Sequence, residues 1–315
     1  MRDSPLQAPV PAPARVHLSL IAVQFMFASL SVVAKKLVLP ELPPFAFIAA
    51  RATIATAILG IAYAARPERV AWRDLPVLFG YAFFGIIANQ LLFILGLERS
   101  TATNAVVIGA VIPVFTVGVA LALRRERATA LKLVGLSVAF AGAMTVVGAG
   151  RFEGGASRLV GNLLMVGNSL CFSIYLVVSR GLLAKYSTLT VTAWTFFFGL
   201  VGVLPFGAPG LIAHAHAASA RAWIGVAYIA VFPTVGTYFL NSYALRVAPS
   251  SLVAIYIYLQ PVIGALMARA WLDERVGLAT AVGAVLIAVG IWLVTRDARR
   301  ALASGWSRRS GGRLP

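Results

Sequence analysis

The feature that most constrains this chain is a succession of long apolar stretches separated by short polar ones. A helix needs about 20 mostly apolar residues to cross the hydrocarbon core of a membrane, where its backbone must satisfy its own hydrogen bonds. Of the 315 residues 60% are hydrophobic and 12% charged, whereas soluble domains are about one quarter charged. We therefore predict an all-α integral membrane protein. Ten transmembrane helices are predicted, at about residues 17–36, 44–65, 75–97, 102–123, 130–149, 159–180, 188–207, 222–245, 250–271 and 277–295.

The basic residues indicate how these helices are oriented. A net charge of +17 is compatible with nucleic-acid binding, but that requires basic residues on a folded polar surface, which the predicted spans do not leave. If the N-terminus is cytoplasmic, the tails and loops on that side hold 18 Lys and Arg residues, against eight in the opposite loops. Because cytoplasmic loops carry the excess of Lys and Arg, we expect both termini inside, in the inner (plasma) membrane.

The second half of the chain repeats the first at a fixed offset of 148 positions. The correspondence runs without a gap over some fifty residues, across two predicted spans and their loop. Apolar sequences match by chance at many alanines and valines, whereas matched prolines, charges and glycines are more specific. The informative pairs are Pro113 with Pro261, Glu126 with Glu274, Gly135 with Gly283 and Gly142 with Gly290.

Each half contains five predicted spans, an odd number, so the second half enters the membrane from the opposite side. Inverted repeats are a recurring architecture of secondary transporters, whose substrate site lies near the midplane between the repeats. Pro113 and Pro261 interrupt the helical hydrogen bonds at corresponding places, where we expect a bend or the wall of a cavity. The boundaries expected are a disordered N-terminal tail at 1–16, repeats at 17–149 and 159–296, and a basic cytoplasmic tail at 297–315.

Two segments resemble the duplicated signature of the EamA family, which belongs to the drug/metabolite transporter superfamily. They are GLERSTATNAVVIGAVIPVFTVGVALALRRER and YALRVAPSSLVAIYIYLQPVIGALMARAWLDER, and PPFAFIAARATIATAIL resembles the second span of that family, with Arg51 at its arginine. The resemblance covers roughly residues 17–296. It implies ten transmembrane helices in two inverted EamA-like halves and transport of small metabolites, often amino acids or drugs. It leaves the substrate open.

No motif points to catalysis. The sequence has no HExxH, nucleophile elbow or Walker A motif and no paired carboxylates within a span, so we expect no enzymatic activity and no cofactor. Two loop histidines, His214 and His216, are too few for a metal site. The single cysteine, Cys171, excludes an intrachain disulfide.

Polar side chains at membrane depth are costly and therefore informative. Amides and tyrosines within the spans are our candidates for binding substrate, because together they would hold a zwitterion or a planar apolar group. The alternative is that the amides join helices to one another. Asn168 and Tyr175 share a helix face, as do Tyr238 with Asn241 and Tyr256 with Gln260. The candidates for substrate binding are Gln24, Asn89, Asn168, Tyr175, Tyr238, Asn241, Tyr256 and Gln260.

A second group of residues is expected to act in structure or gating: Arg51, Pro113, Pro261, Glu126 and Glu274. Arg51 is the one clearly intramembrane charge. It either neutralises a substrate carboxylate, or has a structural role in which it pairs with helix C-terminal carbonyls or snorkels to the membrane surface. Glu126 and Glu274 end their helices as gates or as solvated residues paired with adjacent arginines.

The sequence as a whole predicts a secondary transporter that exports small organic metabolites, such as amino acids, by alternating access. A drug or organic-cation exporter of the same fold is the first alternative, although a cation would favour a buried carboxylate that the spans lack. A membrane scaffold without transport activity is the second. Coupling to protons or to a counter-solute stays open, since proton coupling usually requires a titratable group near the midplane.

Overall fold

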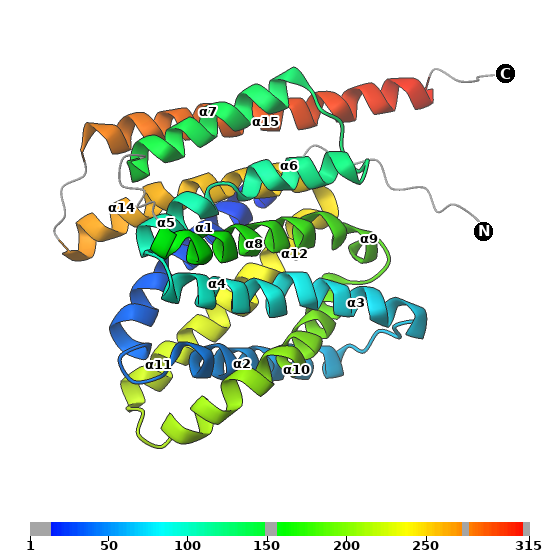
Figure 1. Ribbon diagram of the computed structural model, residues 1–315. Helices are drawn as coiled ribbons and strands as arrows, with labels where there is room; N and C mark the ends of the chain where they lie inside the picture. Colours follow the sequence, from blue (N-terminus) through cyan, green and yellow to red (C-terminus); the bar gives the residue numbers. More distant parts are fainter. Residues whose placement is uncertain (1–13, 149–155, 273–276, 311–315) are drawn as a thin grey trace.

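The computed structural model describes residues 14–148, 156–272 and 277–310, and every regular element in these ranges is helical. Nine of the described helices are long and apolar enough to cross a membrane, and the shorter apolar helix Ala14–Leu30 makes ten. The helices lie side by side in a bundle, and the first and last described residues lie at the same end of it (Figure 1). We call this end the terminal face. The prediction of an all-α membrane protein with ten transmembrane helices in two inverted repeats is confirmed.

The first half contains five spans. The first span is α1 (Ala14–Val33) continued by η1 (Ala34–Val38), and the second is α2 (Pro44–Ala65). The third consists of η2 (Trp72–Asp74), α3 (Leu75–Ala82), η3 (Phe83–Ile87) and α4 (Ala88–Glu98). The fourth consists of α5 (Ala102–Gly109) and α6 (Ile112–Ala122), and the fifth is α7 (Ala130–Val147).

The second half repeats this order. The sixth span is α8 (Ala156–Val178) followed by the short α9 (Arg180–Leu183), and the seventh is α10 (Thr188–His214). The eighth consists of α11 (Ala220–Ile229), η5 (Ala230–Gly236) and α12 (Thr237–Val247). The ninth consists of α13 (Ser250–Ile255), η6 (Tyr256–Tyr258) and α14 (Leu259–Leu272), and the tenth is α15 (Leu278–Ser310).

Local sequence explains where several helices begin. Thr101, Thr129, Ser187 and Ser219 each precede a helix and accept a hydrogen bond from the backbone N–H three residues later. Such N-caps satisfy one of the backbone donors that a helix start leaves unpaired. Pro44 opens α2 at a position that lacks an intrahelical partner in any case.

The packing of α7 against α15 shows the symmetry of the repeats. A Cβ atom at Gly135 would lie 2.9 Å from the carbonyl oxygen of Gly290, and one at Gly142 would lie 2.7 Å from that of Gly283. By sequence, Gly135 corresponds to Gly283 and Gly142 to Gly290. Gly135 therefore packs against the counterpart of Gly142, and Gly142 packs against the counterpart of Gly135, as a two-fold axis between equivalent helices requires. The two helices lie side by side along one edge of the bundle (Figure 1).

Helix irregularities also fall at corresponding places. The π-helical segment η3 covers 83–87, and an offset of 148 carries it to 231–235, inside the π-helical η5. The fourth span breaks between α5 and α6 just before Pro113, and the ninth passes through the 3₁₀ segment η6 just before Pro261. Irregular turns of this kind inside helices often mark functional sites.

Serine side chains of α8 stabilise the break in the fourth span. The hydroxyl of Ser169 donates to the carbonyl oxygen of Ile108 at 3.3 Å, and that of Ser173 donates to that of Ile112 at 3.0 Å. Non-helical backbone at membrane depth is tolerated where protein groups satisfy it in this way.

Several helix ends differ from the prediction. The sequence predicts that α10 ends at 207, but the helix continues to His214 with Pro205 and Pro209 inside it. α2 packs closely along it: a Cβ at Gly207 would lie 2.4 Å from the carbonyl oxygen of Phe45. α15 continues to Ser310, into the predicted tail, and α1 begins at Ala14. The rest of the predicted N-terminal tail, and Glu274, lie outside the described residues.

Candidate functional site

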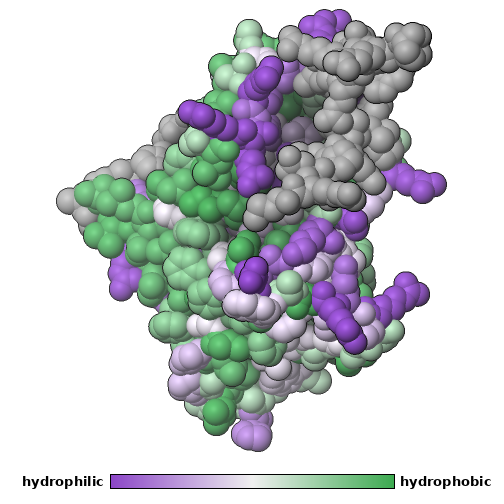
Figure 2. Space-filling view, turned by 90° about the vertical axis from the view of Figure 1, so that its right-hand side faces the viewer, coloured by the Kyte–Doolittle hydropathy of each residue, from purple (hydrophilic) through white to green (hydrophobic). Residues whose placement is uncertain are grey.

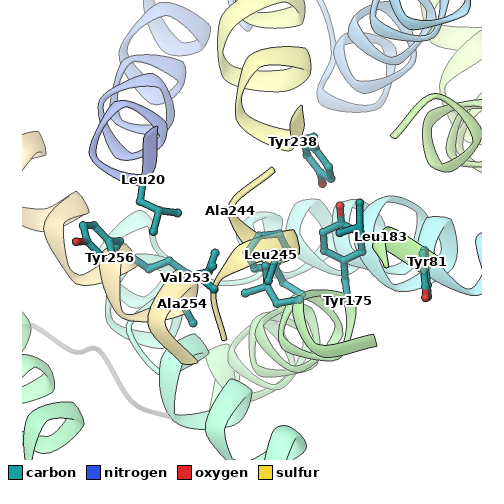
Figure 3. Packing of buried hydrophobic residues seen from close by; sticks show 14 of the residues in the cluster. Leu20, Tyr81, Tyr175, Leu183, Tyr238, Ala244, Leu245, Val253, Ala254 and Tyr256 are labelled. Carbon is teal, nitrogen blue, oxygen red and sulfur yellow. The ribbon is translucent and has the colours of Figure 1, made fainter. Parts of the chain in front are cut away.

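An aromatic cluster occupies the centre of the bundle, where α8, α10 and α12 meet. Tyr175 lies 5.8 Å from Tyr238 between ring centroids and stacks on Phe172 at 6.0 Å, and Phe196 meets Tyr238 edge-on at 4.9 Å. All four residues are buried. In the close view, the hydroxyl ends of Tyr175 and Tyr238 point toward one another (Figure 3). Two predicted site residues are thus in contact.

The irregular third span supplies a hydrogen-bond acceptor to this cluster. The hydroxyl of Tyr238 donates to the carbonyl oxygen of Gly85, in η3, at 2.6 Å. A Cβ at Gly85 would lie 2.6 Å from the ring of Tyr175, so glycine is needed for the ring to lie against this turn. The bond joins the third span of one repeat to the eighth span of the other.

Arg51 lies beside this cluster on α2. Its residue surface is 9% exposed, its guanidinium carbon lies 5.5 Å from the centre of the Phe47 ring, and Tyr238 lies nearby. No hydrogen bond or ion pair joins Arg51 to any other described residue.

A second polar group joins α1 to the ninth span. Gln260 donates its amide nitrogen to the side-chain oxygen of Gln24 at 2.9 Å. One helical turn earlier, Tyr256 shares a hydrogen bond of 2.5 Å with His17, also on α1. Four side chains from the two repeats therefore form two contacts along one face of α1, and three of the four are predicted site residues.

The amides of the third and sixth spans are paired with each other. Asn168 donates its side-chain nitrogen to the carbonyl oxygen of Asn89 at 2.8 Å, and Asn89 donates to that of Asn168 at 3.4 Å. In this conformation both amides join α4 to α8, as in the helix-joining alternative. Asn241 is buried on α12, one turn from Tyr238.

Glu126 is part of a clasp between the repeats at the terminal face. We use the term clasp for Glu126, Lys132, Ser250 and Ser251. The carboxylate of Glu126 accepts hydrogen bonds from the hydroxyl groups of Ser250 at 2.6 Å and of Ser251 at 2.5 Å, and from the backbone N–H of Ser251 at 3.1 Å. The Lys132 ammonium lies 2.9 Å away, and the Glu126 side chain is only 6% exposed.

The clasp holds Glu126 ionised. Burial alone would raise the pKa of this carboxyl group, but the Lys132 charge and the hydrogen bonds from Ser250 and Ser251 outweigh it and lower the pKa below the usual 4.5. Glu126 therefore pairs with Lys132 of the next helix rather than with the adjacent arginines that the sequence indicated, and it is buried rather than solvated.

Further contacts close the terminal face around the clasp. Asp74 of the third span accepts hydrogen bonds from Lys185 and, at 2.5 Å, from Tyr186, and Glu68 accepts from Thr190 at 2.6 Å. Figure 2 looks onto this face and shows hydrophilic side chains gathered on it. All these contacts join the first repeat to the second, so the halves are fastened together here.

The described residues contain no group of three His, Cys, Asp or Glu side chains that would hold a metal ion.

Each of the two repeats matches the same known protein family. The sequence pattern of the EamA-like transporter family matches residues 15–148 and again residues 159–296. The chain belongs to the EamA-like transporter family. Both matches together extend over nearly all of the described residues, and each contains one of the two interrupted spans.

Several curated relatives of this EamA-like protein carry transporter names. An uncharacterized transporter from Archaeoglobus fulgidus is 30% identical over 289 residues, which cover 89% of this chain and 97% of the relative. A probable terminal-alkyne amino-acid exporter from Streptantibioticus cattleyicolor is 29% identical over 265 residues, covering 82% and 87%. A solved crystal structure with 20% identity has a TM-score of 0.75 over 91% of this chain and 99% of its own, which shows the fold alone.

Several functional contacts of the EamA-like protein escape sequence reasoning. Lys132 of α7 and the two serines of α13, Ser250 and Ser251, gather at Glu126, and no local spacing indicates this. Gly85 looks like an ordinary glycine of an apolar span. One signal was available: Ser250 and Ser251 directly follow Pro249 at a helix start, where backbone donors are unpaired and attract a carboxylate.

Proposed function

We propose that this protein is a secondary transporter that exports a small organic solute, such as an amino acid, by alternating access between its two inverted repeats. Membership in a transporter family supports transport, and the printed name of the Streptantibioticus relative supports amino-acid export. In inverted-repeat transporters, substrate binds where discontinuous spans of the two repeats meet. The contact between discontinuous spans of the two repeats, such as that of Tyr238 with Gly85, is the observation that best supports the proposal.

The spans in question are the third and eighth, with their π-helical segments, and the fourth and ninth, with their breaks. The substrate site in this proposal lies among the candidate residues of these spans and their neighbours. Tyr175, Tyr238 and Asn241 form its aromatic side, and Gln24, Tyr256 and Gln260 form its amide side. Asn89 and Asn168 fix α4 against α8 and so position the aromatic side.

Alternating access requires that contacts at one face break while those at the other form. We propose that the present conformation is closed at the terminal face, where the clasp and the Asp74 and Glu68 contacts join the repeats. Under the inverted symmetry, Glu274 would take the place of Glu126 at the opposite face. Pro113 and Pro261 would act as the bending points of the fourth and ninth spans.

The orientation is part of the same proposal. The terminal face carries most of the loop Lys and Arg residues, which supports cytoplasmic termini and an inner-membrane location. In this orientation the present conformation is closed toward the cytoplasm.

The alternatives make different demands on the structure. An organic-cation exporter would favour an acidic group at membrane depth, and within the described spans Asp and Glu occur only near helix ends, as Asp74, Glu98 and Asp297. A scaffold would have its amides paired between helices, which the Asn89–Asn168 pair matches. Transport activity separates the scaffold from both exporters.

The test is uptake of labelled amino acids into proteoliposomes that contain the purified protein, with and without an imposed pH gradient. We expect saturable uptake of one class of amino acid, reduced at least tenfold by Gln260→Ala. Dependence on the gradient would establish proton coupling, and its absence would favour a counter-solute. Failure to transport any solute in the presence of a folded protein would contradict the proposal.

A further inference from the structure

The guanidinium group of Arg51 is a buried charge that has no ion-pair or hydrogen-bond partner among the described residues. It belongs to α2, seven residues after Pro44 and so about 10 Å into the span. A buried charge in a membrane normally pairs with an opposite charge or with backbone carbonyls. Among the described residues, Arg51 makes neither an ion pair nor a hydrogen bond.

No acidic residue of the described chain is free to neutralise Arg51. Each of the six described carboxylates already has a partner elsewhere: Glu41 with Ser219, Glu68 with Thr190, Asp74 with Lys185, Glu98 with Arg99, Glu126 with Lys132 and Asp297 with Thr129. An anion for Arg51 therefore has to come from outside the part of the chain that the structure describes.

Arg51 points into the protein rather than toward lipid. The exposed residues Thr53 and Ala57 lie about 160° and 120° from it around the helix, at 100° per residue. Its position falls between Ile48, which belongs to the main core cluster, and Phe47, which belongs to the smaller cluster at the opposite end of α1. Snorkelling to the membrane surface would leave the side chain exposed, whereas Arg51 is buried.

The nitrogen atoms of Arg51 are not completely enclosed. The described polar atoms that are fully enclosed and lack a partner belong to His17, Ser179, Trp194 and Tyr258. The nitrogen atoms of Arg51 also lack a hydrogen-bond partner among the described residues, but they are not fully enclosed. A molecule of the size of water can therefore reach the guanidinium group. A polar ligand can therefore approach the donors of Arg51.

The surroundings of Arg51 are aromatic. Phe47 lies against the guanidinium, and the nearby Tyr238 belongs to the cluster of Tyr175 and Phe196. An arginine offers a planar fork of donors that matches a carboxylate, and the rings offer surface to an apolar body.

We propose that Arg51 is the anion subsite of this transporter and binds the carboxylate of a substrate whose apolar or aromatic body packs against the Tyr238 cluster. This inference rests on the proposed function and narrows its substrate class to carboxylates, excluding organic cations without an acidic group. Charge-assisted hydrogen bonds of this kind change affinity roughly ten- to hundredfold.

The experiment compares acids with their amides in proteoliposomes. The uptake of labelled L-leucine and L-phenylalanine is challenged with unlabelled leucine, leucinamide, phenylalanine and phenylalaninamide, for the wild type, Arg51→Lys, Arg51→Met and the matched control Arg66→Gln at the exposed end of α2. We expect each acid to compete at least tenfold better than its amide in the wild type and in Arg66→Gln. Arg51→Met should abolish this preference, and Arg51→Lys should keep part of it.

The thermal stability of the same proteins in detergent, with and without each compound, provides a second measurement that does not need transport. Stabilisation by the acids but not by the amides, lost in Arg51→Met, supports the anion subsite even without uptake, and then only the proposed transport of these solutes fails. Uptake in which the amides compete equally well, or in which Arg51→Met keeps the preference, overturns the subsite and leaves transport standing. If neither uptake nor acid-specific stabilisation is observed, both the anion subsite and the proposed transport of these solutes are overturned.

Discussion

Ser251 donates its backbone N–H to the carboxylate of Glu126 at 3.1 Å, although 125 positions separate them in the sequence. The same carboxylate receives the hydroxyl of Ser251 and the ammonium of Lys132. One side chain in the loop after the fourth span thus satisfies the start of α13 in the second repeat. Any motion that separates the repeats at the terminal face has to break the hydrogen bonds from Ser250 and Ser251 to Glu126.

Removing the charge of Glu126 should destabilise the protein strongly. Glu126→Gln keeps the shape of the side chain but leaves the buried Lys132 without its counter-charge, and breaking a buried ion pair in this way typically costs roughly 3–5 kcal/mol. The control is Glu98→Gln, whose pair with Arg99 is half exposed and should contribute at most about 1 kcal/mol. Denaturation of both variants in detergent measures the difference, and equal stabilities would show that the clasp is not a stabilising contact.

The two serines allow the clasp to be weakened without disturbing the ion pair. Ser251→Ala removes one hydroxyl donor to Glu126, and we expect opening at the terminal face to become about five- to tenfold more frequent, since one hydrogen bond contributes about 1 kcal/mol. The measurement is thiol labelling of a cysteine placed at the buried Leu252, in a Cys171→Ser background. Unchanged labelling would mean that the repeats do not separate at this face.

The pH dependence of the clasp follows from the lowered pKa of Glu126. A carboxyl group whose pKa is lower in the folded protein contributes stability above its usual value of 4.5 and loses it as the pH falls through the folded value. The stability difference between the wild type and Glu126→Gln should therefore be constant at neutral pH and shrink below about 4.5. Denaturation between pH 8 and pH 4 tests this, and a difference that changes near pH 7 would contradict it.

The sequence predicts the spans, the repeat and its inversion because long apolar runs and matched prolines and glycines are local signals. It does not predict the clasp, because Lys132 and Ser251 reach Glu126 only through the packing of three helices. It does not predict η3 either, since an apolar run reads alike in α- and π-helical form. The continuation of α10 through Pro205 depends on α2 packing alongside. The isolation of Arg51 is predictable in part, because no predicted span contains an Asp or Glu.

The close glycine contacts between α7 and α15 give another prediction. Gly142→Ala places a methyl group 2.7 Å from the carbonyl oxygen of Gly283, so the helices must move apart, at a cost of about 1–3 kcal/mol. At Gly118 no atom lies within 4 Å of an added Cβ, so Gly118→Ala should change stability by less than about 0.5 kcal/mol. Denaturation in detergent compares the two. Equal effects would contradict the packing across the two-fold axis.

The hydrogen bond between Gln24 and Gln260 joins α1 to the interrupted ninth span, and a double-mutant cycle tests whether it acts as a unit. Gln24→Leu and Gln260→Leu each leave one amide unpaired at membrane depth, whereas the double variant removes both. We therefore expect the double variant to be more stable than the sum of the single losses by about 0.6 kcal/mol, the average for hydrogen bonds between transmembrane helices. Thr145→Val, on an exposed helix surface, serves as a control that couples to neither glutamine.

Transport by the same three variants separates binding from packing. If the two amides bind substrate, uptake stays low in the double variant although its stability recovers, because no amide remains to contact the solute. If they only join helices, uptake recovers together with stability. Recovery of both would remove Gln24 and Gln260 from the proposed site and leave the Tyr238 cluster and Arg51 as its remaining part.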